Sequence, residues 1–202
     1  MMPLHFFYNI LISLAWFGLK VIALFRPKIH LFVSGRKNTF PLLEEKLSGS
    51  KKTIWMHVAS LGEYEQGLPI LEGLRHNYPE HQIVLTFFSP SGYEVKKNTT
   101  AADVVVYLPM DTLSNAKRFL ERTDPELAIF VKYEIWPNYL SELKKRKVPI
   151  FLVSALFSKR QIYFKVFGGF MRKSLRTFAH FFVQDINSRE LLESIGFSNV
   201  TI

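Results

Sequence analysis

From Thr53 onward the sequence alternates short apolar runs with amphipathic segments. Each run is rich in Val, Ile, Leu and Phe and is followed by a stretch with the apolar spacing of a helix; the runs are TIWMHVAS, QIVLTFF, DVVVYLP, ELAIFV, PIFLVSA and HFFVQ. Because the runs are continuously apolar, they are typical of parallel strands that are buried on both faces. We therefore expect an α/β fold, with a Rossmann-like parallel sheet and helices on both of its faces, over residues 53–202.

In such a sheet, ligands bind beyond the carboxyl ends of the strands. The residues that follow the apolar runs are therefore the first candidates for a binding or catalytic site. They carry hydroxyl, carboxylate and guanidinium groups, together with glycines at the turns. The candidates are Ser60, Gly62 and Glu63 after the first run, Ser89, Ser91 and Gly92 after the second, Glu134 after the fourth and Arg160 after the fifth.

Several residue types and motifs that the sequence lacks narrow the range of functions it could have. The chain has no cysteine, which excludes a disulfide scaffold, a Cys-ligated metal centre and a cysteine nucleophile. It has no GxGxxG after the first run and no GxxxxGK[ST], which argues against ordinary dinucleotide and P-loop nucleotide binding. The histidines are scattered, and His57, inside an apolar run, is expected to be a core histidine. We therefore expect no metal and no cofactor.

Two acidic residues stand out by their position. Glu63 should lie in the first turn of a helix, where the helix dipole and the free N–H groups stabilise a carboxylate. Such a carboxylate can act as a general base on a substrate hydroxyl, although an ordinary charge at a helix N-terminus gives the same pattern. Glu134 precedes Pro137, a residue type that favours the first helical position, and its simpler interpretation is a capping or loop acid.

The N-terminal segment is apolar. Residues 1–19 contain no charged side chain, and residues 4–25 contain only Lys20, over a length close to the ~20 residues that cross a bilayer. Basic residues follow the segment, so the positive-inside rule places the remainder in the cytoplasm. We expect residues 1–26 to be a membrane anchor that spans the bilayer or lies in its interface, with a helix docked on the protein as the alternative. Residues 27–52 are expected to be a linker with a short helix.

The charge distribution indicates an anionic partner. The chain has 26 Lys and Arg against 17 Asp and Glu, a net charge of +9. The stretch from Lys159 to Arg176 has six basic residues and no acidic one, interleaved with aromatic and aliphatic residues. A basic helix there would suit a membrane surface or a phospholipid-like ligand, and a plain solvated face is an equally good interpretation. The sequence stops at Ile202 on the start of a further strand, so we expect it to be part of a longer protein.

Taken together and in order, the segments after the apolar runs resemble the motifs of a known family, the 3-deoxy-D-manno-oct-2-ulosonic acid (Kdo) transferases of lipopolysaccharide synthesis. The resemblance covers essentially the whole chain but only the first half of the family's length. The segments are HVASLGE (57–63), TFFSPSGYE (86–94), VVYLPMD with RFL (105–111 and 118–120), YEIWPN (133–138), SALFSKR (154–160) and VQD (183–185).

The resemblance implies a membrane-associated, two-domain GT-B glycosyltransferase. Such an enzyme transfers Kdo from CMP-Kdo to a hydroxyl of the lipid A precursor, with inversion and without a catalytic metal. The family's catalytic base falls on Glu63, its second motif acid on Glu134, and a later Arg on Arg160. The chain departs from the family at Lys132, where a further Glu is often found, and at residues 154–156, where Asn-Ala-Arg is common.

The resemblance also implies the roles of the parts. Residues 53–202 would be the acceptor-side domain, inactive alone because the donor-side domain is absent. The partners would be CMP-Kdo, the lipid A precursor and the cytoplasmic face of the inner membrane. The remaining candidates after the runs would bind the acceptor. The alternative is a non-catalytic, membrane-anchored Rossmann-like module that binds anionic lipid or a protein. Nucleic-acid binding through the basic stretch is a weaker third interpretation, which the apolar N-terminal segment disfavours, so we expect no nucleic-acid partner.

Overall fold

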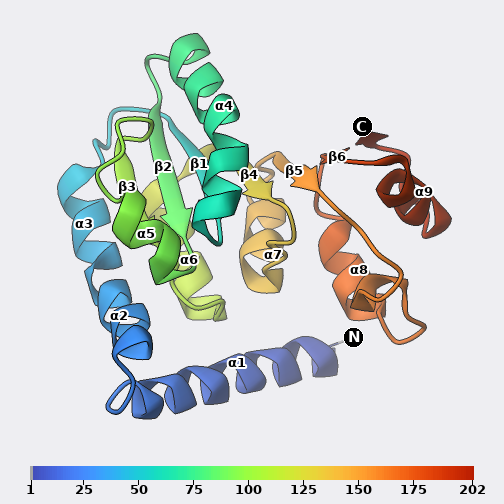
Figure 1. Ribbon diagram of the computed structural model, residues 1–202, viewed down its shortest axis with the longest axis horizontal. Coiled ribbons are helices and arrows are strands. Elements are labelled where there is room, and N and C mark those ends of the chain that lie inside the picture. Colours follow the sequence, from blue (N-terminus) through green and yellow to red (C-terminus); the bar gives the residue numbers. More distant parts are fainter. Residues whose placement is uncertain (1) are drawn as a thin grey trace.

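The computed structural model of the protein describes residues 2–202. Its centre is a seven-stranded sheet in the order β3-β2-β1-β4-β5-β6-β7, with every neighbouring pair parallel (Figure 1). The expected α/β fold with a parallel sheet is therefore confirmed. The strands are β1 (Thr53–Val58), β2 (Gln82–Phe87), β3 (Val104–Tyr107), β4 (Pro125–Val131), β5 (Ile150–Ala155), β6 (His180–Val183) and β7 (Val200–Thr201).

Helices cover both faces of the sheet, and each face has its own hydrophobic core. Side chains alternate between the two cores along each strand, so that Trp55 of β1 packs on one face while Met56 packs on the other. One core lies under α4 (Leu61–Asn77) and α5 (Pro90–Lys96). The other core lies under α3 (Thr39–Lys46), α6 (Leu113–Thr123), α7 (Pro137–Lys145), α8 (Gly169–Leu175) and α9 (Ile186–Ser194).

The chain order reverses between β1 and β4. From β1 the chain proceeds outward through β2 and β3, and it then returns to place β4 on the other side of β1. In open α/β sheets, the crevice beyond the carboxyl ends of the strands at such a switch point is the usual ligand site. Because Glu63 follows β1 and Glu134 follows β4, both acids lie at the switch point.

The segment expected to be a linker is mostly helical. It forms α2 (Pro27–Gly35), a 3-10 turn (Arg36–Asn38) and α3. Two of its polar residues, Arg36 and Thr39, are buried against backbone carbonyls, which the sequence pattern did not predict. Arg36 donates to Leu108 O at 2.9 Å, and Thr39 Oγ1 donates to Tyr107 O at 2.9 Å. The segment thereby covers the end of β3.

The stretch from Lys159 to Arg176 is not the single helix that the sequence suggested. It comprises a loop, a 3-10 turn (Ile162–Phe164), a second loop and the short helix α8. Gly168 explains the interruption, because a Cβ at this position would lie 2.0 Å from Ile162 O. The chain therefore folds back on itself too tightly for a continuous helix.

At the N-terminus, α1 (Met2–Ile22) is a long helix that lies along the domain (Figure 1). It passes the first turns of α6 and α7, beyond the carboxyl end of β2. Its residues Leu4–Ile22 are long and apolar enough, by length and composition, to cross a membrane.

Candidate active site at the switch point

Glu63 lies in the first turn of α4, as expected. The helix begins at Leu61 after Ser60, and the Glu63 carboxylate turns back to accept a hydrogen bond from the Ala59 N–H. Burial of the side chain raises the pKa of Glu63 above its ordinary value, and the Ala59 hydrogen bond opposes that shift. One carboxylate oxygen makes this bond, which leaves the other for a substrate.

Glu134 is held by two donors in the turn between β4 and α7. Its Oε2 accepts from His57 Nε2 at 3.0 Å and from Trp136 Nε1 at 2.9 Å. The negative charge of Glu134 further raises the pKa of Glu63, whereas His57 and Lys132 lower it. The two carboxylates are therefore electrostatic neighbours at one edge of the sheet.

A chain of hydrogen bonds joins Glu134, in the turn after β4, to side chains of β1 and β2. Trp55 Nε1 donates to Thr86 Oγ1 at 2.8 Å, and Thr86 Oγ1 lies 2.8 Å from His57 Nδ1. The other ring nitrogen of His57, Nε2, contacts Glu134, so the imidazole bridges Thr86 and Glu134. This chain fixes the orientation of Glu134 from the protein interior.

His57 is the functional residue that sequence reasoning missed. It is fully buried and hydrogen-bonded, as expected of a core histidine, but one of its partners is the site carboxylate Glu134. The contact joins residues 77 positions apart, so no local pattern could reveal it. The available signal was the alternation along β1, which places His57 on the same face as Trp55.

The serine and glycine candidates gather beside Glu63. Ser89 is the N-cap of α5, where its Oγ accepts from Ser91 N at 3.3 Å. A Cβ on Gly92 would lie 2.9 Å from Leu61 N, so this glycine lets the start of α5 pack on the start of α4. Ser60 and Gly62 belong to the same α4 start. Arg160 lies apart, exposed on the loop after β5.

Two of the four described non-glycine residues with positive φ lie at the same edge, and the other two, Asp124 and Lys147, precede strands at the opposite edge. Lys132, directly after β4, has φ 61°, and Ser154, near the end of β5, has φ 53°. Non-glycine residues in this left-handed region typically cost ~1–3 kcal/mol and cluster at functional sites. Both positions are also places where the chain departs from the Kdo transferase motifs.

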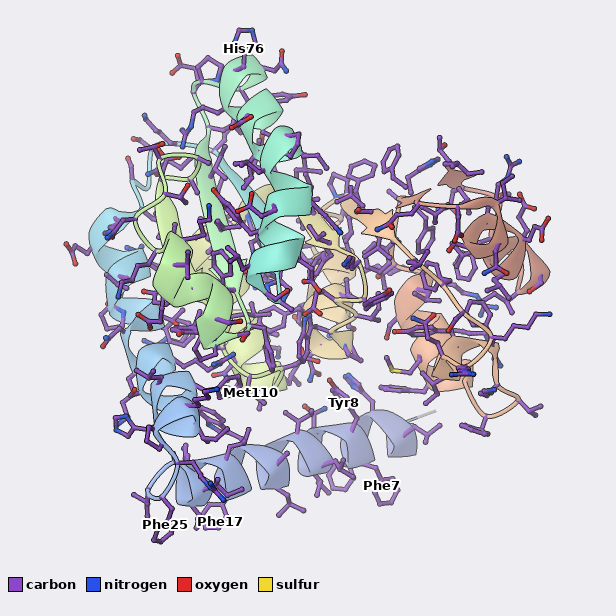
Figure 2. All side chains as sticks on the ribbon, in the orientation of Figure 1. Phe7, Tyr8, Phe17, Phe25, His76 and Met110 are labelled. Carbon is purple, nitrogen blue, oxygen red and sulfur yellow. The ribbon has the colours of Figure 1, made fainter. Side chains whose placement is uncertain are left out.

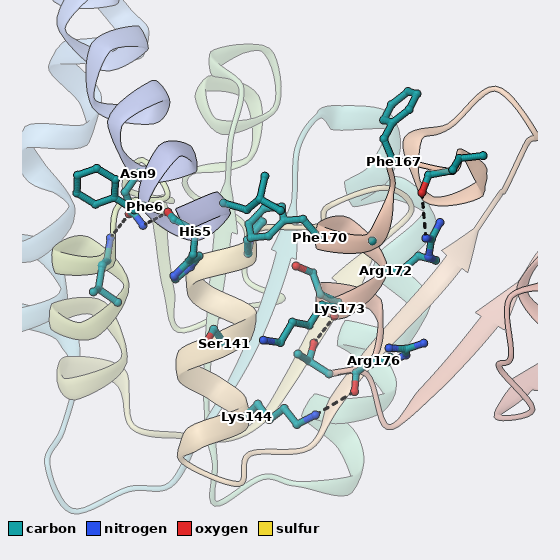
Figure 3. Close-up of a pocket in the computed structure, with 17 residues that line it drawn as sticks. His5, Phe6, Asn9, Ser141, Lys144, Phe167, Phe170, Arg172, Lys173 and Arg176 are labelled. Atoms are coloured by element: carbon teal, nitrogen blue, oxygen red, sulfur yellow. Dashed lines mark hydrogen bonds between the residues drawn. The ribbon is translucent and has the colours of Figure 1, made fainter. Parts of the chain in front are cut away.

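A large cavity lies on the face of the sheet that α7 and α8 cover, and its lining does not include the two carboxylates. It measures about 1280 Å³ and lies between the start of α1, α7 and α8 (Figure 3). Its lining combines aromatic and aliphatic side chains with four cations: Phe6, Val166, Phe167, Phe170, Lys144, Arg172, Lys173 and Arg176. Pro137, three positions after Glu134, also lines it, so the cavity and the switch point adjoin at the start of α7. Within residues 2–202 no cluster of three or more His, Asp or Glu could hold a metal ion.

A family model described as 3-deoxy-D-manno-octulosonic-acid transferase (kdotransferase) matches residues 34–202. The chain belongs to this family. A 3-deoxy-D-manno-octulosonic acid transferase of Aquifex aeolicus is 39% identical over 120 residues, which cover 59% of this chain and 32% of the relative. One of Rickettsia bellii is 26% identical over 204 residues, covering 100% of this chain and 48% of the relative. The chain therefore spans about half the length of the Kdo transferases it matches, or less.

Solved structures support the fold. The UDP-GlcNAc 2-epimerase of Neisseria meningitidis, bound to UDP-GlcNAc, aligns with a TM-score of 0.55 at 12% identity over 74% of this chain and 46% of that one. The UDP-N-acetylglucosamine 2-epimerase of Rickettsia bellii aligns with a TM-score of 0.53 at 16% identity over 74% of this chain and 44% of that one. At these identities the likeness shows the fold alone, a Rossmann-like domain.

Proposed function

We propose that this chain is the acceptor-side half of a Kdo transferase, which transfers Kdo from CMP-Kdo to a hydroxyl of the lipid A precursor. The observation that carries the proposal is a carboxylate, Glu63, buried at the switch point of a chain that belongs to the family. The donor contacts would come from the part of the relatives that this chain does not span. We therefore expect the chain to be inactive alone.

Glu63 is the proposed general base. A sugar hydroxyl is too weak an acid to attack without proton removal. As the acceptor oxygen bonds to the anomeric carbon of Kdo, CMP leaves from the opposite side with the bonding pair, and Glu63 takes the hydroxyl proton. The raised pKa of Glu63 makes its carboxylate a stronger proton acceptor than an ordinary carboxylate. This course inverts the anomeric centre.

The rest of the edge would position the acceptor. Glu134, fixed by His57 and Trp136, is available to orient an acceptor hydroxyl, and Ser60, Ser89 and Ser91 lie at the starts of α4 and α5, the first of which carries Glu63. Helix N-termini and basic residues can meet the departing phosphate, so the proposed step needs no metal. The cavity beside α8 and the exposed Arg160 are suited to the acyl chains and phosphates of the acceptor.

The cellular setting follows from the same chemistry. A lipid acceptor remains in the bilayer, and the apolar α1 gives the protein a means of staying beside it. We place the protein on the cytoplasmic face of the inner membrane, where the basic residues that follow the apolar segment can meet anionic head groups.

The test is Glu63→Gln in a complete enzyme that contains this half. We expect transfer to fall by about 10²–10⁴ in rate with acceptor binding unchanged, because Gln keeps the size of Glu but cannot accept the proton. Glu65→Gln is the matched control, since Glu65 lies on the same helix with an exposed side chain paired to Lys96 at 3.0 Å. Near-normal transfer by Glu63→Gln would overturn the assignment of the base.

A non-catalytic lipid-binding module is the second candidate, and the apolar, basic cavity is the observation that favours it. It predicts that lipid binding is the only measurable activity, even in the complete protein with CMP-Kdo supplied. Detection of Kdo transfer that depends on Glu63 would exclude it.

A further inference from the structure

Helix α1 has two distinct faces. The side chains that point away from the domain are large and apolar, and they recur every three or four residues: Phe7, Leu11, Leu14 and Phe17 are each 60–69% exposed. The opposite face carries His5, Tyr8, Asn9, Ile12 and Trp16, which are partly buried. Figure 2 shows Tyr8 directed toward the domain, with Phe7, Phe17 and Phe25 directed away from it. A helix surrounded by lipid would expose apolar side chains on all sides. In contrast, α1 turns one side, which includes the polar Tyr8 and Asn9, toward the domain.

The inward face is fastened by polar contacts near its start. Tyr8 Oη donates to Asp111 Oδ2 at 2.7 Å. Asn9 Oδ1 accepts from Leu113 N at 3.3 Å and from Asn138 Nδ2 at 3.1 Å. Asp111 is fully buried and also accepts from the Asn138 and Tyr139 amides at the start of α7. We call the contacts of Tyr8 and Asn9 with Asp111, Leu113 and Asn138 the latch.

The far end of α1 also contacts the domain. The Trp16 ring lies 6.4 Å from the ring of Phe32 in α2, and Ala23, just after α1, is buried. A helix that crossed the bilayer could touch a cytoplasmic domain at one end only. With contacts at both ends, α1 and the domain instead lie along each other over a helix length of about 30 Å.

From these contacts we propose that α1 lies in the plane of the membrane surface, held by the latch, and does not cross the bilayer. The occupant of its outward face is a bilayer that contains anionic lipid. The proposal rests on the membrane association in the proposed function and is independent of Kdo transfer.

Neighbouring residues extend the same membrane-facing edge. Val166 and Phe167, 99% and 79% exposed, line the same cavity as Leu4 and Phe6 of α1 (Figure 3). Exposed basic residues lie beside this apolar edge and complement anionic head groups. They are Lys20, Arg26, Lys28 and Lys173.

The orientation also brings the switch point to the membrane. From Trp16 and Phe32, an aromatic path continues through Phe88, 5.2 Å from Phe32, to Trp136, 4.7 Å from Phe88. Trp136 donates to Glu134. A surface-lying α1 therefore places the carboxylate edge beside the bilayer, within reach of an acceptor whose acyl chains stay embedded.

Because the chain has no cysteine, single cysteines can report the depth of α1. Phe7→Cys, Leu14→Cys and Val21→Cys fall on the outward face at seven-residue spacing. Each is labelled with a fluorophore and quenched by lipids brominated at defined depths, in phosphatidylethanolamine–phosphatidylglycerol vesicles. His76→Cys, at the far end of α4 from α1, is the aqueous control (Figure 2).

We expect the three labels on α1 to share one shallow depth and the label at position 76 to escape quenching. A crossing helix rises 1.5 Å per residue, so successive labels would differ in depth by about 10 Å, and that result would overturn the proposal. Absence of quenching at all three sites would also overturn it, because a protein partner or a second copy would then cover the face.

The latch is tested by combining Tyr8→Phe and Asn9→Ala with each label. We expect the depth at position 7 to separate from that at position 21, because the start of the helix is released. Ser13→Ala is the control, since the Ser13 hydroxyl bonds only within α1, to Asn9 O at 2.8 Å. Equal depths in the double variant would overturn the role of the latch. The readout is fluorescence, so it is unaffected by the outcome of the Glu63→Gln test.

Discussion

At the scale of single residues, the charge state of Glu63 is set by opposing neighbours. Burial and the Glu134 charge raise its pKa, while the Ala59 amide, His57 and Lys132 lower it. The pKa of such a carboxylate responds to substitutions around it, and the sign of each neighbouring charge decides the direction of the shift.

We therefore predict opposite shifts from two variants. Glu134→Gln removes a like charge and should lower the pKa of Glu63, whereas Lys132→Met removes an opposite charge and should raise it. Carboxyl NMR titration of this chain measures both without any donor substrate. Shifts of the same sign in the two variants would contradict the arrangement of charges described above.

Asp111 gives a second residue-scale prediction. Burial raises its pKa from 3.8 to about 6, although the donors from Tyr8, Asn138 and Tyr139 oppose the shift. A pKa raised on folding contributes stability that is fully present below about pH 4 and is lost as pH rises through about 6. The loss is on the order of 3 kcal/mol for two pKa units.

Urea unfolding of the wild type and of Asp111→Asn, at pH 5 and pH 7.5, measures this contribution. The wild type should gain stability relative to the variant as the pH falls, because only Asp111 can take up the proton. A stability difference that does not change with pH would show that Asp111 titrates normally.

At the scale of elements, the starts of α4 and α5 depend on close packing at Gly92. A methyl group there would come within 2.9 Å of Leu61 N and 2.6 Å of the Phe87 ring. Gly92→Ala should therefore lower the free energy of unfolding by about 1–3 kcal/mol. Gly73→Ala, in the same helix layer but with no atom within 4 Å, should instead stabilise by up to about 1 kcal/mol. Chemical denaturation of both variants checks the contrast, and equal effects would refute it.

Elements with a clear apolar period could be predicted, and those shaped by distant contacts could not. The strands and the placement of Glu63 and Glu134 at their ends followed from continuous apolar runs. The helical 27–46 segment did not, because Arg36 and Thr39 are buried through bonds to carbonyls about 70 positions away. The same holds for the contact of His57 with Glu134 and that of Asn9 with Asn138, which lie 129 positions apart. The sequence pattern does not reveal the hydrogen-bond partner of a polar residue when that partner lies far along the chain.

At the scale of the whole molecule, one edge gathers the membrane-facing helix, the cavity and the two carboxylates. The sheet positions the two carboxylates, and α7 and α8 form one side of the cavity. The latch holds α1 against the domain, so that the start of α1 forms another side of the cavity. In the proposed orientation, two surfaces would contact the membrane: the apolar face of α1, and the loop at Val166 and Phe167 with its basic neighbours.

Deletion of residues 1–25 separates these two surfaces. The truncated chain should keep its fold, because the sheet and both hydrophobic cores lie within residues 40–200. Its vesicle binding should fall sharply, and what remains should weaken as salt rises, since exposed charges are screened beyond ~10 Å at 0.1 M. Adding Lys165→Ala and Lys173→Ala to the deletion should abolish the vesicle binding that remains.

Sedimentation with anionic vesicles at low and high salt measures the binding of all of these forms. Undiminished, salt-independent binding by the truncated chain would show that α1 is not the principal membrane contact, whereas a loss of cooperative unfolding would show that α1 is part of the folding unit.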